Sequence, residues 1–416
     1  MRLNELLIYR DLKEGKLLYE LDRINKEPEK TGFYDWIYHL VDFSVSHGFS
    51  GNLWQMYITY LFVENENVYS RACEIKGNIE GSLNDLALHD FAIFLEAFQM
   101  DFKDLQDHYP TKELFRFLDF EETKESGNIY NKRIKERIEI LCKELNKAKD
   151  SQEFKDSVTS FYQDFGVGTF GLHKAFRVEK NEKEQVKIVP ITKTAHVNLE
   201  DLVGYKEAKE KLIQNTLAFV EGKKANNCLL FGDAGTGKSS SIKAILNKYY
   251  DKGLRIIEIY KHQFQDINEV IRLIKNRNYK FILYMDDLSF EEFEIEYKYL
   301  KAVIEGGLEK KPDNVLIYAT SNRRHLVREK WSDKEDRRED LHASDTVEEK
   351  LSLAARFGVS IFFVAPNKKE YENIVKVLAE KHNISMDEET LFLEAKKWEL
   401  SHGGLSGRTA AQFINY

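Results

Sequence analysis

The sequence predicts an α/β protein built on a parallel sheet, with a mostly α-helical domain before the sheet and a helical lid after it. Helical and strand patterns alternate from residue 206 to residue 364, which is typical of a parallel sheet covered on both faces. A glycine-rich loop lies between a strand and a helix within that stretch. Upstream, residues 31–120 are rich in aromatics and follow helical spacing.

Residues 1–190 are expected to form the helical domain and a linker. Ser82 and Asp85 form a capping-box type of start for a helix whose apolar positions follow at helical intervals. The aromatics of residues 34–60 could line a groove for a partner, but such density is more typical of a core. The charged run 179–184 and Pro190 indicate the linker, which places the boundary near residue 190.

The composition limits the class of protein. A chain of 416 residues with 42% hydrophobic content is globular and long enough for about two or three domains. The net charge of −8 creates no field that attracts nucleic acid, so nucleic-acid binding would need a local basic face. The three cysteines lack metal or redox spacing, and no apolar run approaches the roughly 20 residues of a membrane span. We expect a cytoplasmic protein that does not enter membranes.

The core is expected to span residues 191–366 and the lid residues 367–416. The predicted helices of the core are 206–221, 267–276, 294–305 and 347–357, with a further helix after the glycine-rich loop, and its strands are 227–231, 254–260, 280–285, 315–320 and 359–364. Ligands of such sheets bind at the carboxyl ends of the strands. Polar side chains at these ends are therefore the candidate binding residues.

A Walker A loop follows the strand 227–231. Its glycines let the main chain turn tightly and aim several N–H groups into one concavity, where they can hold phosphate. Lys238 is placed to reach the β and γ phosphates, Ser239 offers a hydroxyl to Mg²⁺, and the following helix points its positive end at the anion. The predicted phosphate-binding residues are Gly232, Asp233, Ala234, Gly235, Thr236, Gly237, Lys238, Ser239 and Ser240.

A Walker B motif ends the strand 280–285. Asp286 follows this apolar strand and is expected beside Ser239, where both can hold Mg²⁺. Many hydrolytic proteins with such sites carry Glu at the next position. This chain has Asp287 there, whose side chain is one methylene shorter. We predict Asp287 as the residue that polarises the attacking water, with Glu291 or Glu292 as alternatives.

Further candidates follow later strands and helices. Asn322 follows the strand 315–320 and is placed to orient the water or to contact the γ-phosphate. Arg323, Arg356 and Arg408 are cations that could stabilise charge on the phosphoryl oxygens.

Together these motifs resemble those of the AAA+ ATPases. Ala319–Asn322 looks like sensor 1, Ala355–Phe357 precedes the last strand, and Gly404–Arg408 looks like sensor 2. From about Phe161 to Tyr416 the chain is similar to a bacterial family catalogued as domain of unknown function 815, which has no settled activity. The resemblance implies an AAA+ type core with ATP and Mg²⁺ as cofactors.

The resemblance also implies roles for single residues. Val203 and Gly204 look like the segment that holds adenine by backbone and an apolar side chain. Arg356 looks like an arginine finger that completes a neighbouring subunit's site, which implies a homo-oligomer, and Arg408 would close the lid over its own subunit's nucleotide. The Asp286-Asp287 ending is also similar to that of replication initiators and helicase loaders, but this chain lacks a recognisable DNA-binding module.

We therefore predict an AAA+ ATPase that hydrolyses ATP with Mg²⁺ to remodel a protein or nucleoprotein client, which the helical domain would select. Two alternatives stay open. One is a nucleotide-gated loader or adaptor that associates with DNA. The other is an ATP-binding interaction protein that does not hydrolyse ATP, which the unusual Asp287 makes plausible.

Overall fold

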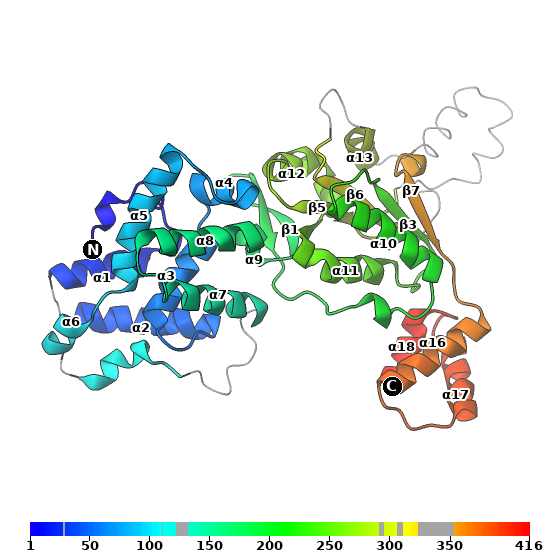
Figure 1. Ribbon diagram of the computed structural model, residues 1–416. Helices are drawn as coiled ribbons and strands as arrows, with labels where there is room; N and C mark the ends of the chain where they lie inside the picture. The colour runs from blue at the N-terminus through cyan, green and yellow to red at the C-terminus, as the bar shows by residue number, and fades with distance from the viewer. Residues whose placement is uncertain (28–29, 110, 122–131, 291–294, 306–310, 323–352) are drawn as a thin grey trace. The chain divides into compact units, whose positions relative to one another are not determined.

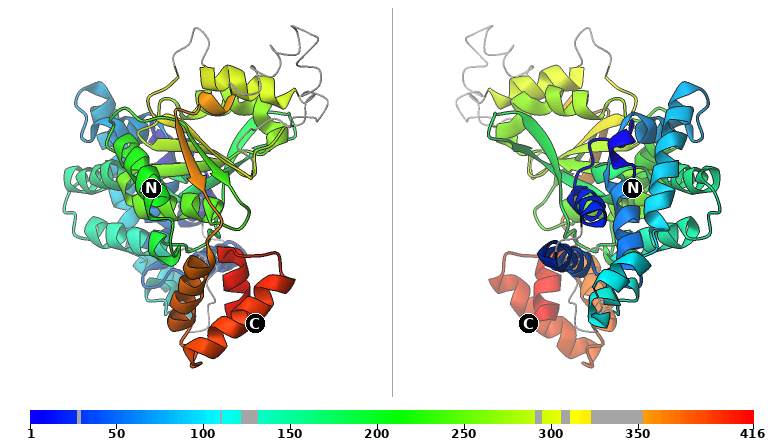
Figure 2. Two further views of the ribbon diagram at one scale, coloured as in Figure 1. Left: turned by 90° about the vertical axis from the view of Figure 1, so that its right-hand side faces the viewer. Right: turned by 90° about the vertical axis from the view of Figure 1, so that its left-hand side faces the viewer.

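The structure, a computed structural model, describes residues 1–27, 30–109, 111–121, 132–290, 295–305, 311–322 and 353–416. The chain divides into two compact units, Met1–His173 and Lys174–Tyr416, which Figures 1 and 2 show. In the part of the chain that is described, no helix is both long enough and apolar enough to cross a membrane.

The first unit is built from helices around an aromatic core. Trp36, Trp54 and Tyr57 are each at most 1% exposed, so these aromatics belong to the core, whereas Tyr38 is 67% exposed. The indole N–H groups of Trp36 and Trp54 donate to the carbonyls of Leu17 and Ala97, which satisfies them inside the core. The helices are α1 (Lys16–Lys26), α2 (Lys30–His47), α3 (Leu53–Glu64), α4 (Val68–Lys76), α5 (Ser82–Phe98), α6 (Lys103–His108), α7 (Lys132–Leu145), α8 (Ser151–Phe165) and α9 (Gly168–Leu172).

The start of α5 differs from the prediction. The helix begins at Ser82, but its N-cap is Gly81, and no side chain caps it. The expected capping box of Ser82 and Asp85 is therefore wrong, because Ser82 already lies within the first turn.

A buried carboxylate fastens the N-terminal segment to α5. Asp90 is fully buried and accepts hydrogen bonds from three successive backbone N–H groups, those of Leu7, Ile8 and Tyr9, at 2.7–3.1 Å. Such bonds to a carboxylate are stronger than neutral ones, and they compensate for the burial of its charge. The sequence before α1 is thus held in place although it forms only one short 3-10 turn, Leu3–Glu5.

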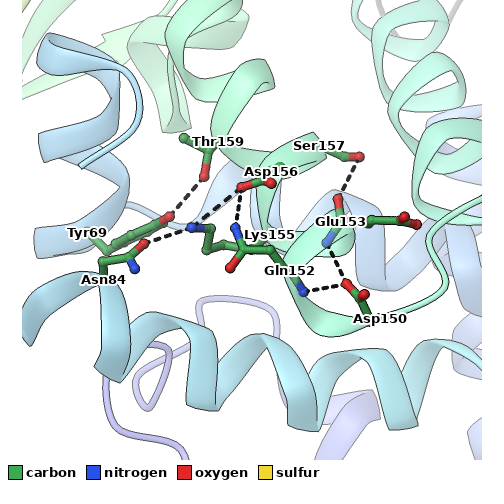
Figure 3. A network of polar contacts seen from close by, with 9 residues as sticks. All are labelled: Tyr69, Asn84, Asp150, Gln152, Glu153, Lys155, Asp156, Ser157 and Thr159. Carbon is green, nitrogen blue, oxygen red and sulfur yellow. Dashed lines mark hydrogen bonds and ion pairs between the residues drawn. The ribbon is translucent and has the colours of Figure 1, made fainter. Parts of the chain in front are cut away.

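A second polar network lies between α8 and its neighbours (Figure 3). The side chain of Lys155 is only 2% exposed, and its ammonium donates to Asn84 Oδ1 at 2.8 Å and pairs with Asp156 at 3.4 Å. Nearby, the hydroxyls of Tyr69 and Thr159 lie 2.9 Å apart and share a hydrogen bond. These contacts link α4, α5 and α8 through groups that would otherwise be costly to bury.

The second unit contains one seven-stranded sheet with the order β2-β1-β4-β5-β6-β3-β7. All neighbouring strands are parallel except the β1–β2 pair. The strands are β1 (Ala175–Lys180), β2 (Val186–Pro190), β3 (Cys228–Gly232), β4 (Leu254–Glu258), β5 (Lys280–Met285), β6 (Val315–Ser321) and β7 (Val359–Phe363). The predicted strands are all present, and the predicted parallel α/β core is confirmed.

The direction of the crossovers places the helices. The connection from β3 to β4 crosses the sheet one way, and the connections from β4 to β5 and from β5 to β6 return the other way, so right-handed crossovers put their helices on opposite faces. On the first face, α10 (Lys206–Val220) and α11 (Lys238–Tyr249) share one hydrophobic cluster with the strands. The returning connections carry α12 (Ile267–Ile274) and α13 (Glu296–Glu305).

The expected linker forms part of the sheet. Residues 175–190 fold into the β1–β2 hairpin, and β1 pairs in parallel with β4. The boundary between the two compact units consequently falls between His173 and Lys174 in the sequence. This position precedes the hairpin and is not near residue 190. The hairpin was overlooked because its strands mix charged and apolar residues, as edge strands that face solvent do.

The lid is a three-helix bundle with its own core. It consists of α16 (Lys368–Lys381), α17 (Glu388–Ser401) and α18 (Gly407–Asn415), drawn in orange and red in Figure 2. Residues 364–367 join it to β7. The predicted helix 347–357 lies mostly outside the described residues. Arg323, Glu291 and Glu292 lie outside them as well.

Candidate functional site

The loop after β3 curls around a central hollow. Gly232 has φ 134°, and a Cβ added there would lie 2.1 Å from the carbonyl oxygen of Phe363, so only glycine fits. Gly237, with φ 88°, is the residue before α11 and turns the chain into that helix. The first N–H groups of α11 consequently face the hollow, as phosphate binding requires.

Lys238 is the buried cation of the loop. It is 6% exposed, and its ammonium donates to the carbonyls of Gly232 (2.9 Å) and Asp233 (2.6 Å) and to Oδ1 of Asn322 (3.0 Å). Burial lowers the pKa of Lys238, although the neighbouring carboxylates of Asp233, Asp287 and Asp286 oppose this shift. Three oxygen atoms thus accept hydrogen bonds from the ammonium, and phosphate oxygens could replace them as acceptors.

Asp286 accepts two hydroxyl hydrogen bonds on one oxygen. Ser239 donates to its Oδ1 at 2.7 Å and Thr320 donates to the same atom at 2.5 Å. Burial raises the pKa of Asp286, but the hydrogen bonds from Thr320 and Ser239 outweigh it, and the net pKa is lowered. Asp286 is thereby kept as a carboxylate beside the Ser239 hydroxyl, which is the pair predicted to bind the metal.

These oxygens fit Mg²⁺ in the presence of a polyphosphate. Among the described residues, no group of three or more His, Cys, Asp or Glu could hold a metal by itself. Mg²⁺ does not need such a cage, because it is usually bound by one or two carboxylates together with waters and phosphate oxygens. Asp286 and Ser239 are thus sufficient as its protein ligands.

Asn322 connects Lys238 to Asp287. Its amide nitrogen donates to Asp287 Oδ1 at 2.7 Å, while its amide oxygen accepts from Lys238. Asp287 has φ 50°, a conformation that few residues other than glycine adopt, and its backbone N–H donates to Thr320 Oγ1 at 2.9 Å. Strain of this kind persists only where surrounding contacts hold it, and it concentrates at functional sites.

These residues line a cavity of about 660 Å³. Apolar side chains of the segment before α10 and of α16 line the same cavity. The size and the mixture of apolar surface with a few convergent polar groups are typical of small-molecule sites. The lining residues are Asp201, Leu202, Val203, Tyr205, Ala234, Gly235, Thr236, Gly237, Lys238, Ser239, Ser240, Asp286, Asp287, Thr320, Asn322, Ile374, Leu378, Gly407, Arg408 and Ala411.

Most of the residues predicted from the sequence line this cavity. Gly204, Gly232, Asp233 and Arg356 do not. Arg356 instead pairs with Glu305 at the end of α13.

Sequence reasoning missed several lining residues. The sequence places Thr320 only within the motif that looks like sensor 1, and Ile374 and Leu378 show only the helical spacing of the lid. Their helical spacing was visible, but which of these side chains turn toward the core depends on how the lid packs on it.

A family model described as "Protein of unknown function (DUF815)" matches residues 171–416. The match contains the complete cavity described above. No curated protein matches the sequence of this chain.

Solved structures of the Holliday junction branch migration motor RuvB from Thermotoga maritima are similar in fold to part of this chain. One has 15% sequence identity and a TM-score of 0.37, and a mutant of the same protein has 16% and 0.37. Each alignment covers 52% of this chain and 63% of the other chain, so this chain spans less than two thirds of those motors. Likeness at this level carries no information about what this chain acts on.

Proposed function

Because the chain belongs to the DUF815 family, whose description assigns no activity, we propose from the site itself that the protein is a Mg²⁺-dependent ATPase of the AAA+ type. The observation that carries the proposal is the convergence of Lys238, Asn322, Asp287, Asp286 and Ser239 in one cavity that is also lined by apolar side chains. In this proposal the polar groups hold the triphosphate and the apolar side chains hold the purine.

In this proposal the phosphates bind the loop N–H groups and Lys238. Bound Mg²⁺ would neutralise charge on the phosphate oxygens, held by Ser239 and Asp286. Asn322 and Asp287 position a water for attack on the γ-phosphate, with the Asp287 carboxylate orienting that water and accepting its proton. Arg408, on the lid, lines the same cavity and neutralises charge on the phosphate oxygens.

We further propose that Arg356 completes the site of a second copy of the chain. In support, Arg408 lines the cavity of its own subunit whereas Arg356 does not, and Arg356 is 29% exposed beside Glu305. An arginine supplied in trans would make hydrolysis depend on assembly. The expected product is a homo-oligomer.

The ATP cycle would serve to remodel a client held by the first unit. Residues 1–173 contain 21 Lys and Arg against 31 Asp and Glu, a net charge of −10, whereas the whole chain carries −8. This charge favours a protein client with a basic surface over nucleic acid, which such a unit repels.

The second candidate function is that of an ATP-binding protein that hydrolyses ATP only slowly. Asp287 is shorter than the usual glutamate, and its carboxylate is already bonded to Asn322. Both features favour an ATP-binding protein in which hydrolysis only resets the bound state.

The test is ATP hydrolysis by the full chain with and without Mg²⁺. We expect Lys238→Ala to lose ATP binding and Asp286→Ala to lose the Mg²⁺-dependent part of turnover. Lys248→Ala is the matched control, because Lys248 is exposed in the same helix and does not line the cavity. Failure of the parent protein to bind ATP with Mg²⁺ would refute the proposed ATPase, and binding without measurable turnover would favour the second candidate.

A further inference from the structure

Asp233 is the second residue of the phosphate loop, yet its carboxylate is bonded outside the cavity. Its Oδ2 accepts a hydrogen bond from the backbone N–H of Ala365 at 2.8 Å. Ala365 belongs to residues 364–367, the stretch between β7 and α16 that joins the sheet to the lid. The side chain of Asp233 therefore contacts the hinge of the lid.

The main chain of the loop holds the same hinge from its other side. The backbone N–H of Asp233 donates to the carbonyl of Phe363 at 3.1 Å, and Gly232 leaves no room for a side chain against Phe363. Asp233 thus bonds the chain both before and after Val364. The last residue of β7 and the second residue of the hinge are therefore both bonded to the loop.

The loop also touches the last helix of the lid. The carbonyl of Gly235 accepts from the backbone N–H of Arg408 at 3.2 Å. A Cβ added to Gly235 would lie 2.9 Å from Ser406 Oγ, so the Ser406 side chain packs directly against Gly235. The loop is consequently bonded to the lid at the lid's entry and again at its final helix.

We infer that Asp233 is a positioning residue that couples the phosphate loop to the hinge, so that occupation of the loop sets the position of the lid. This inference rests on the proposed ATP site and deepens it. Asp233 acts through a hydrogen bond to the backbone of Ala365 and not through contact with phosphate. Its negative charge by itself opposes phosphate binding, so a role in binding alone would not explain an aspartate here.

Two substitutions separate these effects. Asp233→Asn removes the charge but keeps an oxygen that can accept from Ala365, whereas Asp233→Ala removes both. Any benefit to ATP binding from loss of the charge is common to the two variants. The difference between them isolates the hydrogen bond to the hinge.

The experiment measures the position of the lid in the full chain. Cysteines introduced at the exposed Lys211 of α10 and Lys396 of α17 carry spin labels, and Cys73, Cys142 and Cys228 are buried and protected from labelling. Electron paramagnetic resonance gives the distribution of label distances without nucleotide and with ATP and Mg²⁺. The turnover number and KM are measured on the same proteins.

Without nucleotide we expect Asp233→Ala to broaden the distance distribution while Asp233→Asn keeps that of the parent. With ATP, the distance distributions of the parent and of Asp233→Asn should shift to one narrow peak. The turnover number of Asp233→Ala should fall about tenfold below that of Asp233→Asn, which is the effect expected from loss of an exposed hydrogen bond to a charged carboxylate.

Equal distributions and equal turnover in the two variants would overturn the inference. Failure of the parent to bind ATP would instead refute the proposed ATPase, and the nucleotide-free comparison would still decide the role of Asp233.

Discussion

Replacement of Thr320 by valine tests the geometry of the polar end of the cavity. The Thr320 hydroxyl donates to Asp286 and accepts from the backbone N–H of Asp287, and Thr320 is only 2% exposed. Valine has nearly the same shape but no hydroxyl, so both partners lose a bond. A hydrogen bond to a charged group contributes about 1.5–3 kcal/mol, and an unsatisfied buried donor costs about 1–3 kcal/mol.

We expect Thr320→Val to lower the free energy of unfolding of the second unit by about 2–3 kcal/mol, because Asp286 lies near solvent and recovers part of its loss from water. For a unit of this size each kcal/mol shifts Tm by roughly 2–4 °C, so the Tm should fall by roughly 4–12 °C. Turnover should fall as well, because Asp287 is no longer held at positive φ.

Differential scanning calorimetry and an ATPase assay measure the two effects. Thr320→Ser is the matched control, because it keeps the hydroxyl and removes one methyl group, a loss of about 1 kcal/mol. If Thr320→Val and Thr320→Ser agree in both stability and turnover, the hydroxyl does not organise the two aspartates, and the reasoning fails.

Two further predictions concern other parts of the chain. Asp90→Asn should lower the free energy of unfolding of the first unit by about 1–3 kcal/mol, since the negative charge is lost and an amide nitrogen replaces one of the two oxygens that accept from Leu7, Ile8 and Tyr9. Urea unfolding checks this against the exposed Asp85→Asn, and equal stability of the two variants would contradict it. Arg356→Ala and Lys238→Ala should each be inactive but should regain ATPase activity when mixed, because each contributes what the other lacks; an arginine finger accelerates hydrolysis by about 10³–10⁵. Glu305→Gln controls for loss of the Glu305–Arg356 pair, and a mixture as inactive as its components would argue against completion in trans.

The core of the second unit could be predicted because its signals are local. The strand Lys280–Met285 is a run of apolar residues whose limits in the structure are those expected. The aspartates that follow it must lie at the carboxyl edge of the sheet wherever that strand is placed. Asn322 follows directly after β6, and Lys238 and Ser239 begin the helix after the glycine-rich loop, so the same logic predicted that they lie at this edge.

What was missed depends on register and on contacts between distant segments. Thr320 meets Asp286 because β5 and β6 pair Tyr284 with Tyr318 and Met285 with Ala319, which brings the next two residues side by side. No local pattern reveals that register. The β1–β2 hairpin was missed for another reason. It lies at one edge of the sheet and is only partly buried, so its strands mix charged and apolar residues as a linker does.

The two edges of the sheet have unequal roles in the chain's connectivity. The polypeptide leaves α9 at Leu172 and enters β1 at Ala175, next to one edge, and it departs for the lid from β7 at the other. Four strands, β4, β5, β6 and β3, consequently separate the strand that follows the first unit from the strand that leads to the lid.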